Sequence, residues 1–373
     1  MRNKYQGMIK INRRHFIRNL SIAGAVTATG YSSANVFNNA GTESVKMKYR
    51  TLGRTGLKVS EVALGGHFTG MGWKEKGSKR QSLRNEVIGE AYKLGMNFFD
   101  TNEVSESEKI GIALEANGIE RDKILLSADT NAYDGVGKNK SAKEIISDTI
   151  EEVDRHIEAL KTSYVDIFRY TTWSNEYNEM GLKAGLEAFK ILKKDGKARF
   201  FSISNHNPKD LFKMIDEIPE LEILYIPYSY ITRKAEEVLP AAKKRGIGVI
   251  CIKPFVRGTL FNIKNVDLSK MGETIGEMLK ESEKTQEELL KDTKQNLALV
   301  SLKFILDNEN ISTVIPGMET LDEVRENVRA SYEGKITDSD LALLDGFWNN
   351  HQGESCINEM CSGKYHFLRQ WRS

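Results

Sequence analysis

The chain has 373 residues, of which 40% are hydrophobic and 28% charged, enough for one large globular domain or two small ones. Lysine and arginine number 54 against 52 aspartates and glutamates, which leaves a formal net charge of only +2. A nucleic-acid partner is therefore not expected. Three cysteines, Cys251, Cys356 and Cys361, cannot build a disulfide framework. Two alternatives remain open for Cys356 and Cys361: they form a disulfide with each other, or both are free thiols.

The first forty residues differ in composition from the rest of the chain. A basic segment, Asn12–Arg18, contains the pair Arg13-Arg14 and precedes a weakly apolar stretch, Leu20–Thr29, and then small residues. This order resembles a twin-arginine export signal, so we expect residues 1–42 to direct the protein to the periplasm or cell envelope of a bacterium. The apolar stretch is shorter than the roughly 20 residues of a stable membrane span. A basic tail with a chance arginine pair is the alternative.

From residue 47 onward, short apolar runs alternate with amphipathic stretches. The runs have strand length and little internal alternation, as in parallel strands that are buried on both faces. We expect eight of them, at Val62–Leu64, Met96–Phe99, Ile124–Leu126, Val165–Phe168, Ala198–Ile203, Ile223–Ile226, Ile247–Ile252 and Ile311–Ile315.

The stretches between these runs have helical periodicity. We expect helices at Ala142–Lys161, Glu176–Lys194, Lys234–Lys244, Asn296–Leu306, Leu321–Arg329 and Asp338–Trp348, and a helical insertion at Val256–Lys291. Eight strands with intervening helices predict an α/β fold, a closed (β/α)₈ TIM barrel over residues 46–349. A hairpin, Tyr49–Ser60, is expected to plug its N-terminal end, and residues 350–373 form an irregular tail.

Several strand junctions resemble the aldo/keto reductase family. The similar segments are Tyr49–Ser60, Phe98–Thr101, Tyr164–Ile167, Gly196–Arg199 with Ser202–Asn205, and Ile315–Gly317 with Glu326-Asn327. They cover roughly residues 47–349 in the family's order. Leu64–His67 and Ile252–Pro254 further resemble the branch whose exported members often carry a cysteine-rich tail. Here that tail retains only two cysteines, too few to ligate an iron–sulfur cluster.

The resemblance implies carbonyl reduction with NADPH by four residues: a tyrosine acid, a lysine that tunes it, a histidine that orients the substrate and an aspartate that pairs with the lysine. The aspartate corresponds to Asp100, but Ser105 stands in the place of the tyrosine, Asp129 in that of the lysine and Thr171 in that of the histidine. A phenol with its usual pKa of about 10 is a poor acid without a neighbouring cation. Standard carbonyl reduction is therefore not expected.

Asp100 and Asp129 are expected to face each other on adjacent strands. Two close carboxylates repel, which raises one pKa and can create an acid/base pair. Arg169 precedes Thr171 by two residues and so shares its inward direction, and we predict that it pairs with both aspartates. His67 follows the first strand and is expected at the same mouth, as a structural, substrate-contacting or catalytic residue. The spacing of these residues contains no recognised ligand motif, so no metal is expected.

The cofactor positions of the family are better retained. By resemblance, Ser204, Asn205 and Tyr228 belong to the nicotinamide side, where Tyr225 replaces a glutamine. Gly317, Glu326 and Asn327 match the adenine side in the same way. Glu319 stands where the family usually binds the 2′-phosphate with a cation. A carboxylate there favours NAD(H) over NADP(H), unless Glu319 only caps the following helix.

Three functions remain open from the sequence. The first is an aldo/keto reductase-like oxidoreductase with an NAD(P) pocket and a small carbonyl or sugar substrate. The second is a lyase, hydratase or isomerase that uses Asp100, Asp129 or His67. The third is a non-catalytic binding or regulatory barrel, for which aromatic residues expected at the mouth, Trp73, Tyr170 and Trp173, suit sugar stacking as well as plain packing. The oligomeric state is also open.

Overall fold

Seven parallel strands curl into a ring in the computed structural model of the protein, which describes residues 47–65, 78–130, 139–172, 178–261, 273–291 and 295–351. Neighbours in sequence are neighbours in the sheet: β3 (Phe98–Phe99), β4 (Leu125–Thr130), β5 (Val165–Thr171), β6 (Ala198–Ser204), β7 (Ile223–Pro227), β8 (Gly248–Ile252) and β9 (Thr313–Val314). Parallel bridges from Val62 to Val314 and from Leu64 to Phe99 join β9 to β3 and close the ring. The predicted (β/α)₈ barrel is confirmed.

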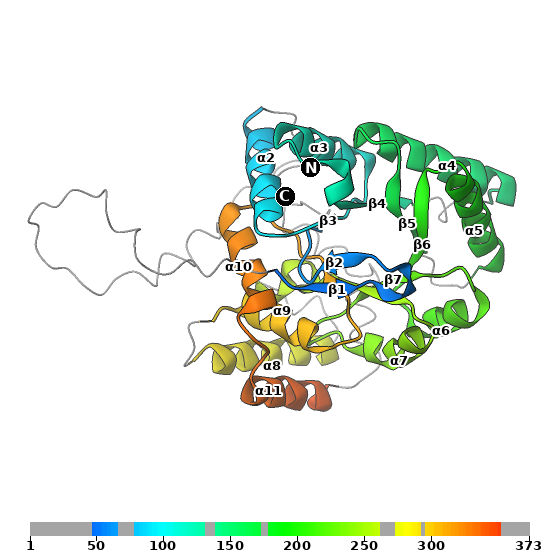
Figure 1. Ribbon diagram of the computed structural model, residues 1–373. Helices are drawn as coiled ribbons and strands as arrows, with labels where there is room; N and C mark the ends of the chain where they lie inside the picture. The colour runs from blue at the N-terminus through cyan, green and yellow to red at the C-terminus, as the bar shows by residue number, and fades with distance from the viewer. Residues whose placement is uncertain are drawn as a thin grey trace, which may run out of the picture. The chain divides into compact units, whose positions relative to one another are not determined.

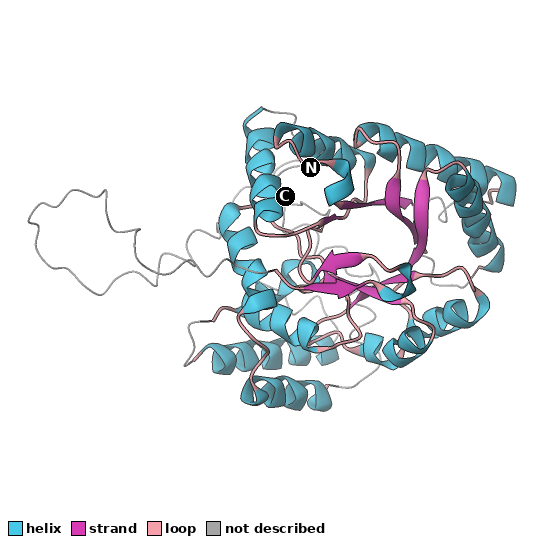
Figure 2. Ribbon diagram, in the orientation of Figure 1, coloured by secondary structure: helices cyan, strands magenta, loops and turns pink. Residues whose placement is uncertain are grey.

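Helices surround this ring of strands (Figure 2). They are α2 (Ser78–Lys93), α3 (Val104–Ala116), α4 (Ala142–Ala159), α5 (Glu179–Lys194), α6 (Pro208–Glu217), α7 (Leu239–Lys244), α8 (Glu273–Leu290), α9 (Leu297–Asp307), α10 (Leu321–Tyr332) and α11 (Asp338–Asn350), labelled in Figure 1. Short 3-10 turns occur at η1 (Gly53–Thr55), η2 (Arg121–Lys123), η4 (Lys234–Glu237) and η5 (Val256–Phe261).

Local sequence explains where several of these helices begin. Ser141 and Glu144 form a reciprocal capping box at the start of α4, because each side chain satisfies a backbone N–H that the helix leaves unpaired. Asn296 caps α9 by accepting from the backbone N–H of Leu299. The predicted helix Lys234–Lys244 is instead divided into η4 and α7. Pro240 lies in the first turn of α7, where its missing N–H is tolerated, whereas in a continuous helix it would leave the carbonyl of Glu236 without its donor.

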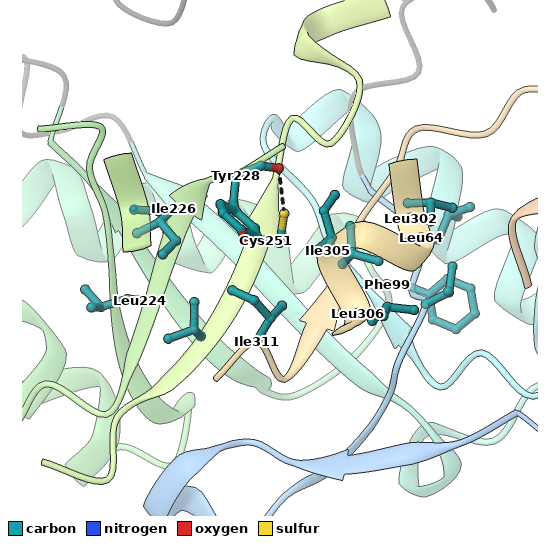
Figure 3. Packing of buried hydrophobic residues seen from close by; sticks show 14 of the residues in the cluster. Leu64, Phe99, Leu224, Ile226, Tyr228, Cys251, Leu302, Ile305, Leu306 and Ile311 are labelled. Atoms are coloured by element: carbon teal, nitrogen blue, oxygen red, sulfur yellow. Dashed lines mark hydrogen bonds between the residues drawn. The ribbon is translucent and has the colours of Figure 1, made fainter. Parts of the chain in front are cut away.

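The side chains of the strands alternate between two hydrophobic layers. The inner layer fills the barrel with Leu52, Val59, Ala63, Phe98, Leu125, Ile167, Ile223, Tyr225, Ile250, Ile252 and Ile315. The residues between them point outward against the helices, and in Figure 3 Cys251 lies beside Ile305 of α9. Each strand position therefore has a side, and this alternation decides which residues reach the barrel interior.

The hairpin β1 (Tyr49–Thr51) and β2 (Lys58–Ser60) is antiparallel and lies against the N-terminal end of β8. Leu52, which is fully buried, belongs to the inner layer of the barrel. Gly53 has φ +52°, and a Cβ there would lie 2.2 Å from the backbone nitrogen of Gly248. Only glycine meets both conditions, so the predicted plug is confirmed and its closest approach depends on this residue.

The described residues belong to one compact unit, Val45–Ser373, whereas Met1–Ser44 form a second unit that lies outside them. His67, Trp73, Trp173, Cys356 and Cys361 also lie outside the described residues. Of the insertion Val256–Lys291, η5 and α8 are described, and α8 is helical as expected. None of the helices in the described ranges is long and apolar enough to span a membrane.

Candidate active site

Three residues that the sequence places at the C-terminal ends of the strands lie close together. Asp100 follows β3, Asp129 is the penultimate residue of β4 and Thr171 ends β5. All three are at least 98% buried, and Thr171 Oγ1 donates a hydrogen bond of 2.5 Å to Asp129 Oδ1. Active sites of (β/α)₈ enzymes form at this end of the barrel, which we call the mouth.

Arg169 joins the two aspartates. Its Nη1 lies 3.0 Å from Asp100 Oδ2, and its Nε lies 3.6 Å from Asp129 Oδ1. Arg169 is also the register partner of Asp129 across β4 and β5. Because an isolated buried guanidinium would lose its hydration without compensation, these contacts are what permit an arginine at this depth. The predicted pairing of Arg169 with both aspartates is confirmed.

The remaining contacts of Arg169 come from residues that the sequence analysis did not connect with it. Nη1 also donates to Asn102 Oδ1 at 2.8 Å, and Nη2 donates to Ser204 Oγ at 3.4 Å. The guanidinium carbon lies 4.6 Å from the centre of the Tyr225 ring, a cation–π contact. We call Asp100, Asn102, Asp129, Arg169 and Tyr225 the arginine cluster.

Asp100 and Asp129 differ in how well their charge is compensated. Asp100 receives the shorter Arg169 contact and a hydrogen bond of 2.6 Å from Ser127 Oγ. Burial raises the pKa of Asp129 to about 7, against the opposing effects of Arg169 and of the Thr171 hydroxyl, while Asp100 adds to the rise. The structure therefore shows that the charge of Asp100 is better compensated than that of Asp129, a difference that the sequence could not reveal.

Two other candidates at the mouth contribute less. Ser105 is half-buried in the first turn of α3, and its hydroxyl makes no hydrogen bond to the described residues. Tyr170 is fully buried in the outer layer and donates to the carbonyl of Gly181 at 2.9 Å. Tyr170 therefore packs between β5 and α5, as the packing alternative predicted, and does not line the mouth.

On the nicotinamide side, Ser204 and Asn205 lie at the end of β6, beside Thr171 and Thr172 of the neighbouring strand. Asn205 Nδ2 donates to Thr172 Oγ1 at 2.7 Å, and Asn205 Oδ1 accepts from the backbone N–H of Asn207 at 2.7 Å. These bonds fix the orientation of the Asn205 amide before any ligand binds. Ser204 faces the interior, where it meets Arg169.

The assignment of Tyr228 to the cofactor is corrected by the structure. Tyr225 points into the barrel, so strand alternation turns Tyr228 outward. Its ring lies in the outer layer, 5.5 Å from the ring of Phe304 on α9, and its hydroxyl donates to Glu236 at 2.7 Å. Figure 3 shows Tyr228 in this layer beside Cys251, whose thiol donates to the Tyr228 carbonyl. The side chain of Tyr228 therefore belongs to the packing of α9 against the barrel.

On the adenine side, the helix cap is made by residues other than Glu319. Thr320 and Glu323 form the capping box of α10, which removes the explanation that Glu319 merely caps this helix. Glu319 is half-buried just before the cap and interacts electrostatically with Arg84 of α2. Gly317, two residues earlier, is exposed.

Asn327 is 97% buried in α10, and its amide makes no hydrogen bond to the described residues. Its amide atoms are not among the fully buried polar atoms that lack a partner in the described residues, so they reach solvent and can contact a ligand. Glu326 beside it is half-buried, and burial raises the pKa of its carboxyl. The donor set at α10 is therefore compatible with the adenosine end of a dinucleotide.

Comparison with known proteins now decides the family. Residues 61–349 match the Aldo/keto reductase family. The chain belongs to this family. It is 28% identical over 297 residues to L-galactose dehydrogenase from Arabidopsis thaliana, covering 77% of this chain and 89% of that protein. It is 24% identical over 321 residues to the NADH-specific methylglyoxal reductase of Escherichia coli (strain K12), covering 80% of this chain and 97% of that protein.

The fold of this aldo/keto reductase is similar to that of solved members. The aldo-keto reductase AKR11C1 from Bacillus halodurans, in its holo form, superposes with a TM-score of 0.64 at 21% identity, covering 84% of this chain and all of that one. This likeness supports the barrel alone. The family match supports the oxidoreductase interpretation over the lyase, hydratase or isomerase alternative.

Sequence reasoning missed several residues of the site. Asn102 could have been found, because it follows Asp100 by two residues and so shares its inward direction. Lys253 could not: it follows β8 with φ +55°, and its Nζ lies 3.0 Å from His206 Nε2 after β6. No strand periodicity predicts this pair, because the backbone leaves the strand conformation at Lys253.

Proposed function

We propose that this protein binds a nicotinamide dinucleotide across the C-terminal ends of the barrel strands and no longer uses the tyrosine–lysine proton transfer of its family. The contact between Arg169 Nη1 and Asp100 Oδ2, at 3.0 Å, carries the proposal. By resemblance, Asp100 pairs with a lysine that tunes the tyrosine. Here the carboxylate is engaged by an arginine from another strand.

The rest of the tetrad agrees with this substitution. Ser105, Asp129 and Thr171 supply neither a phenol nor a lysine nor an imidazole. A cation beside the phenol is what makes it an effective acid near neutral pH, and Arg169 is occupied by two aspartates, an asparagine and a serine. Reduction of a carbonyl by the usual route is therefore not supported.

The dinucleotide is supported by residues on both sides of the mouth. Ser204 and Asn205 would hold the nicotinamide carboxamide, and the amide of Asn327, which makes no hydrogen bond to the described residues, would hold the adenosine together with Glu326. Glu319 is one reason to propose NAD(H) over NADP(H), because a carboxylate repels a 2′-phosphate and accepts from a free 2′-hydroxyl. A second is that one relative is an NADH-specific methylglyoxal reductase.

The substrate we propose is a small carbonyl compound or sugar. The named substrates of relatives are of this kind: L-galactose, methylglyoxal and, for a protein 24% identical over 335 residues in Escherichia coli (strain K12), L-glyceraldehyde 3-phosphate. They provide a test panel that covers a free sugar, a small dicarbonyl and a phosphorylated aldehyde.

The purified protein tests this proposal. Absorbance and mass spectrometry show whether a dinucleotide co-purifies, and fluorescence titrations with NADH and NADPH measure both affinities. We expect NADH to bind at least tenfold more tightly than NADPH, and Asn327→Ala to weaken both. If neither NADH nor NADPH binds, the proposed oxidoreductase function is refuted and a non-catalytic barrel is favoured.

We also propose that the protein is exported through the twin-arginine route. The support is the order of Asn12–Arg18, Leu20–Thr29 and the small residues that follow. Fusion of residues 1–42 to a reporter tests this in a bacterium with and without twin-arginine translocation. Export that survives replacement of Arg13 and Arg14 by lysine contradicts it.

A further inference from the structure

We propose that Asp129 is the proton donor of this barrel, delivering a proton from Oδ2 to the oxygen of a substrate carbonyl, with Thr171 as its positioning residue. Asp129 stands where family resemblance places a lysine, so it replaces the missing acid and not only a missing charge. The proposal rests on the proposed function, because carbonyl reduction also needs the dinucleotide. It is carried by the hydrogen bonds, the charges and the position of Asp129.

The hydrogen bonds distinguish the two oxygens of Asp129. Thr171 Oγ1 donates to Oδ1 at 2.5 Å and the backbone N–H of Thr130 donates to Oδ1 at 3.0 Å. The nearer approach of Arg169, at 3.6 Å, is also to Oδ1. All hydrogen bonds from the described residues to this carboxyl therefore reach one oxygen. This is the pattern of a carboxylic acid whose carbonyl oxygen accepts and whose other oxygen carries the proton.

The charges around Asp129 favour the same state. Asp100 faces it from the end of β3 and shares one guanidinium with it, and Asp100 has the closer contact, 3.0 Å against 3.6 Å. Glu152 of α4 adds negative charge from outside the barrel, and Arg169 of β5 is the compensating cation. Two carboxylates and one guanidinium, all at least 96% buried, carry one negative charge too many unless one carboxyl is protonated.

The negative charge of Asp129 is less well compensated than that of Asp100, because Asp100 also receives a hydrogen bond from Ser127. Asp129 is therefore the carboxyl that takes the proton. Burial raises the pKa of Asp129 to about 7, the range in which a general acid works best near neutral pH. Glu106, on α3, is a further buried carboxyl near Asp100, and burial raises its pKa well above the usual value. Glu106 accepts from the backbone N–H of Asn102 at 2.6 Å and so belongs to the support of the cluster.

The position of Asp129 places the acid at the same end of the barrel as the residues that we assign to the nicotinamide. Three neighbouring strands end in series with Asp129 on β4, Thr171 on β5 and Ser204 on β6, and Thr171 is the register partner of Ser204. Ser204 is the residue that we assign to the nicotinamide. Asp129 is therefore two strands away from the nicotinamide side, with Thr171 between them.

The chemical step balances with these groups. A reduced nicotinamide held by Ser204 and Asn205 would supply the hydride for the carbonyl carbon of the substrate. The π electrons of the carbonyl move to oxygen, and that oxygen takes the proton from Asp129 Oδ2. The products are an alcohol, the oxidised dinucleotide and an Asp129 carboxylate, whose new charge is partly compensated by Arg169 and by the Thr171 hydroxyl. Solvent then returns the proton.

The first test is a titration that needs no turnover. Difference infrared spectra of the full chain, compared with Asp129→Asn, follow the carboxylic acid band of Asp129 as pH changes. We expect a protonated Asp129 at pH 6 that ionises near pH 7. In Thr171→Val the transition moves to higher pH, because the lost hydroxyl stabilised the ionised form. An Asp129 that is fully ionised at pH 6 overturns the proposal.

The second test measures hydride transfer from prebound NADH to the best substrate of the panel in a single turnover. In the unmodified chain the rate is expected to fall about tenfold per pH unit above pH 7, and in Asp129→Asn to be at least about 100-fold lower and independent of pH. Asp154→Asn, an exposed member of an α4 salt bridge with Lys197, should leave the rate unchanged. Equal rates for Asp129→Asn and the unmodified chain reject this inference, whereas failure of the unmodified chain to bind NADH rejects the proposed function beneath it.

Discussion

Replacement of Arg169 by methionine tests the energetics of the arginine cluster. Methionine fills much of the same volume but leaves Asp100 and Asp129 without their shared cation. Removing one partner of a buried ion pair costs about 3–5 kcal/mol, because the other charge stays buried and uncompensated. We place Arg169→Met at the upper end of that range at pH 8, since the lost guanidinium contacts two carboxyls, at 3.0 and 3.6 Å, and also donates to Asn102 and Ser204.

The destabilisation should depend on pH in a defined direction. Without Arg169, the folded-state pKa of Asp129 rises further above its unfolded value, because Arg169 is the cation that lowers it. A carboxyl whose pKa is raised in the folded state lowers the stability of the protein as pH rises from the unfolded-state pKa of about 4 to the folded-state pKa. The deficit of Arg169→Met in the free energy of unfolding should therefore be smaller at pH 5.5 than at pH 8. Urea unfolding followed by circular dichroism at both pH values measures it.

Arg199→Met provides a matched comparison. Arg199 pairs at 2.6 Å with Asp166, a fully buried aspartate that keeps a second partner, Arg121, at 2.7 Å. Because Asp166 stays compensated and Arg199 is 46% exposed, we expect a loss of about 1 kcal/mol or less. Equal losses in Arg169→Met and Arg199→Met at pH 8, or a loss in Arg169→Met that does not shrink at pH 5.5, would refute the assigned role of Arg169.

Three further predictions concern other parts of the chain. Asp129→Asn removes a carboxyl whose pKa rises from its ordinary 3.8 to about 7 on burial, so the free energy of unfolding of the variant, relative to the unmodified chain, should increase by about 2–3 kcal/mol between pH 5 and pH 8 in urea unfolding; a constant difference contradicts the shift. Glu319→Arg should strengthen NADPH binding at least tenfold relative to NADH in fluorescence titrations, and an unchanged ratio removes Glu319 from cofactor selection. Gly53→Ala should cost more than about 2 kcal/mol of stability, because it combines φ +52° with a Cβ contact of 2.2 Å to Gly248. Gly56→Ala, at φ +74° in open space, should cost about 1 kcal/mol. Thermal unfolding compares the two variants, and equal costs would show that the contact at Gly53 is relieved.

The fold could be predicted from the sequence because each strand carries its own signal. Apolar runs of strand length, separated by amphipathic stretches, can be recognised without knowing any long-range contact. Seven of the eight runs are strands of the ring. The first run forms only the bridges at Val62 and Leu64, which nevertheless close the barrel. The break between η4 and α7, just before Pro240, shows the limit of periodicity. The hydrophobic pattern continues through this segment, but a continuous helix does not accommodate the proline.

The site could be predicted only as far as strand alternation reaches. Alternation placed Arg169 inside with the two aspartates, and applied to Tyr228 it would have placed that ring outside. It could not say which carboxyl Arg169 approaches more closely, because that depends on side-chain distances set by three strands at once. Nor could strand alternation show that the amide of Asn327 makes no hydrogen bond to the described residues, since hydrogen bonding depends on the whole packed neighbourhood.

In the function that we propose, the location of the cation explains why replacing the lysine that the resemblance implies would change the chemistry as well as the contacts. By resemblance, that lysine projects from the end of the third strand of the family barrel beside the reacting phenol. In this protein the cation projects from β5, two residues before its end, and is held by Asp100, Asn102 and Ser204. A cation fixed in this way stabilises Asp100 but does not lower the pKa of a phenol at the mouth. At the position where the resemblance places the lysine, one oxygen of Asp129 accepts no hydrogen bond from the described residues, and we propose that this acid carries the proton itself.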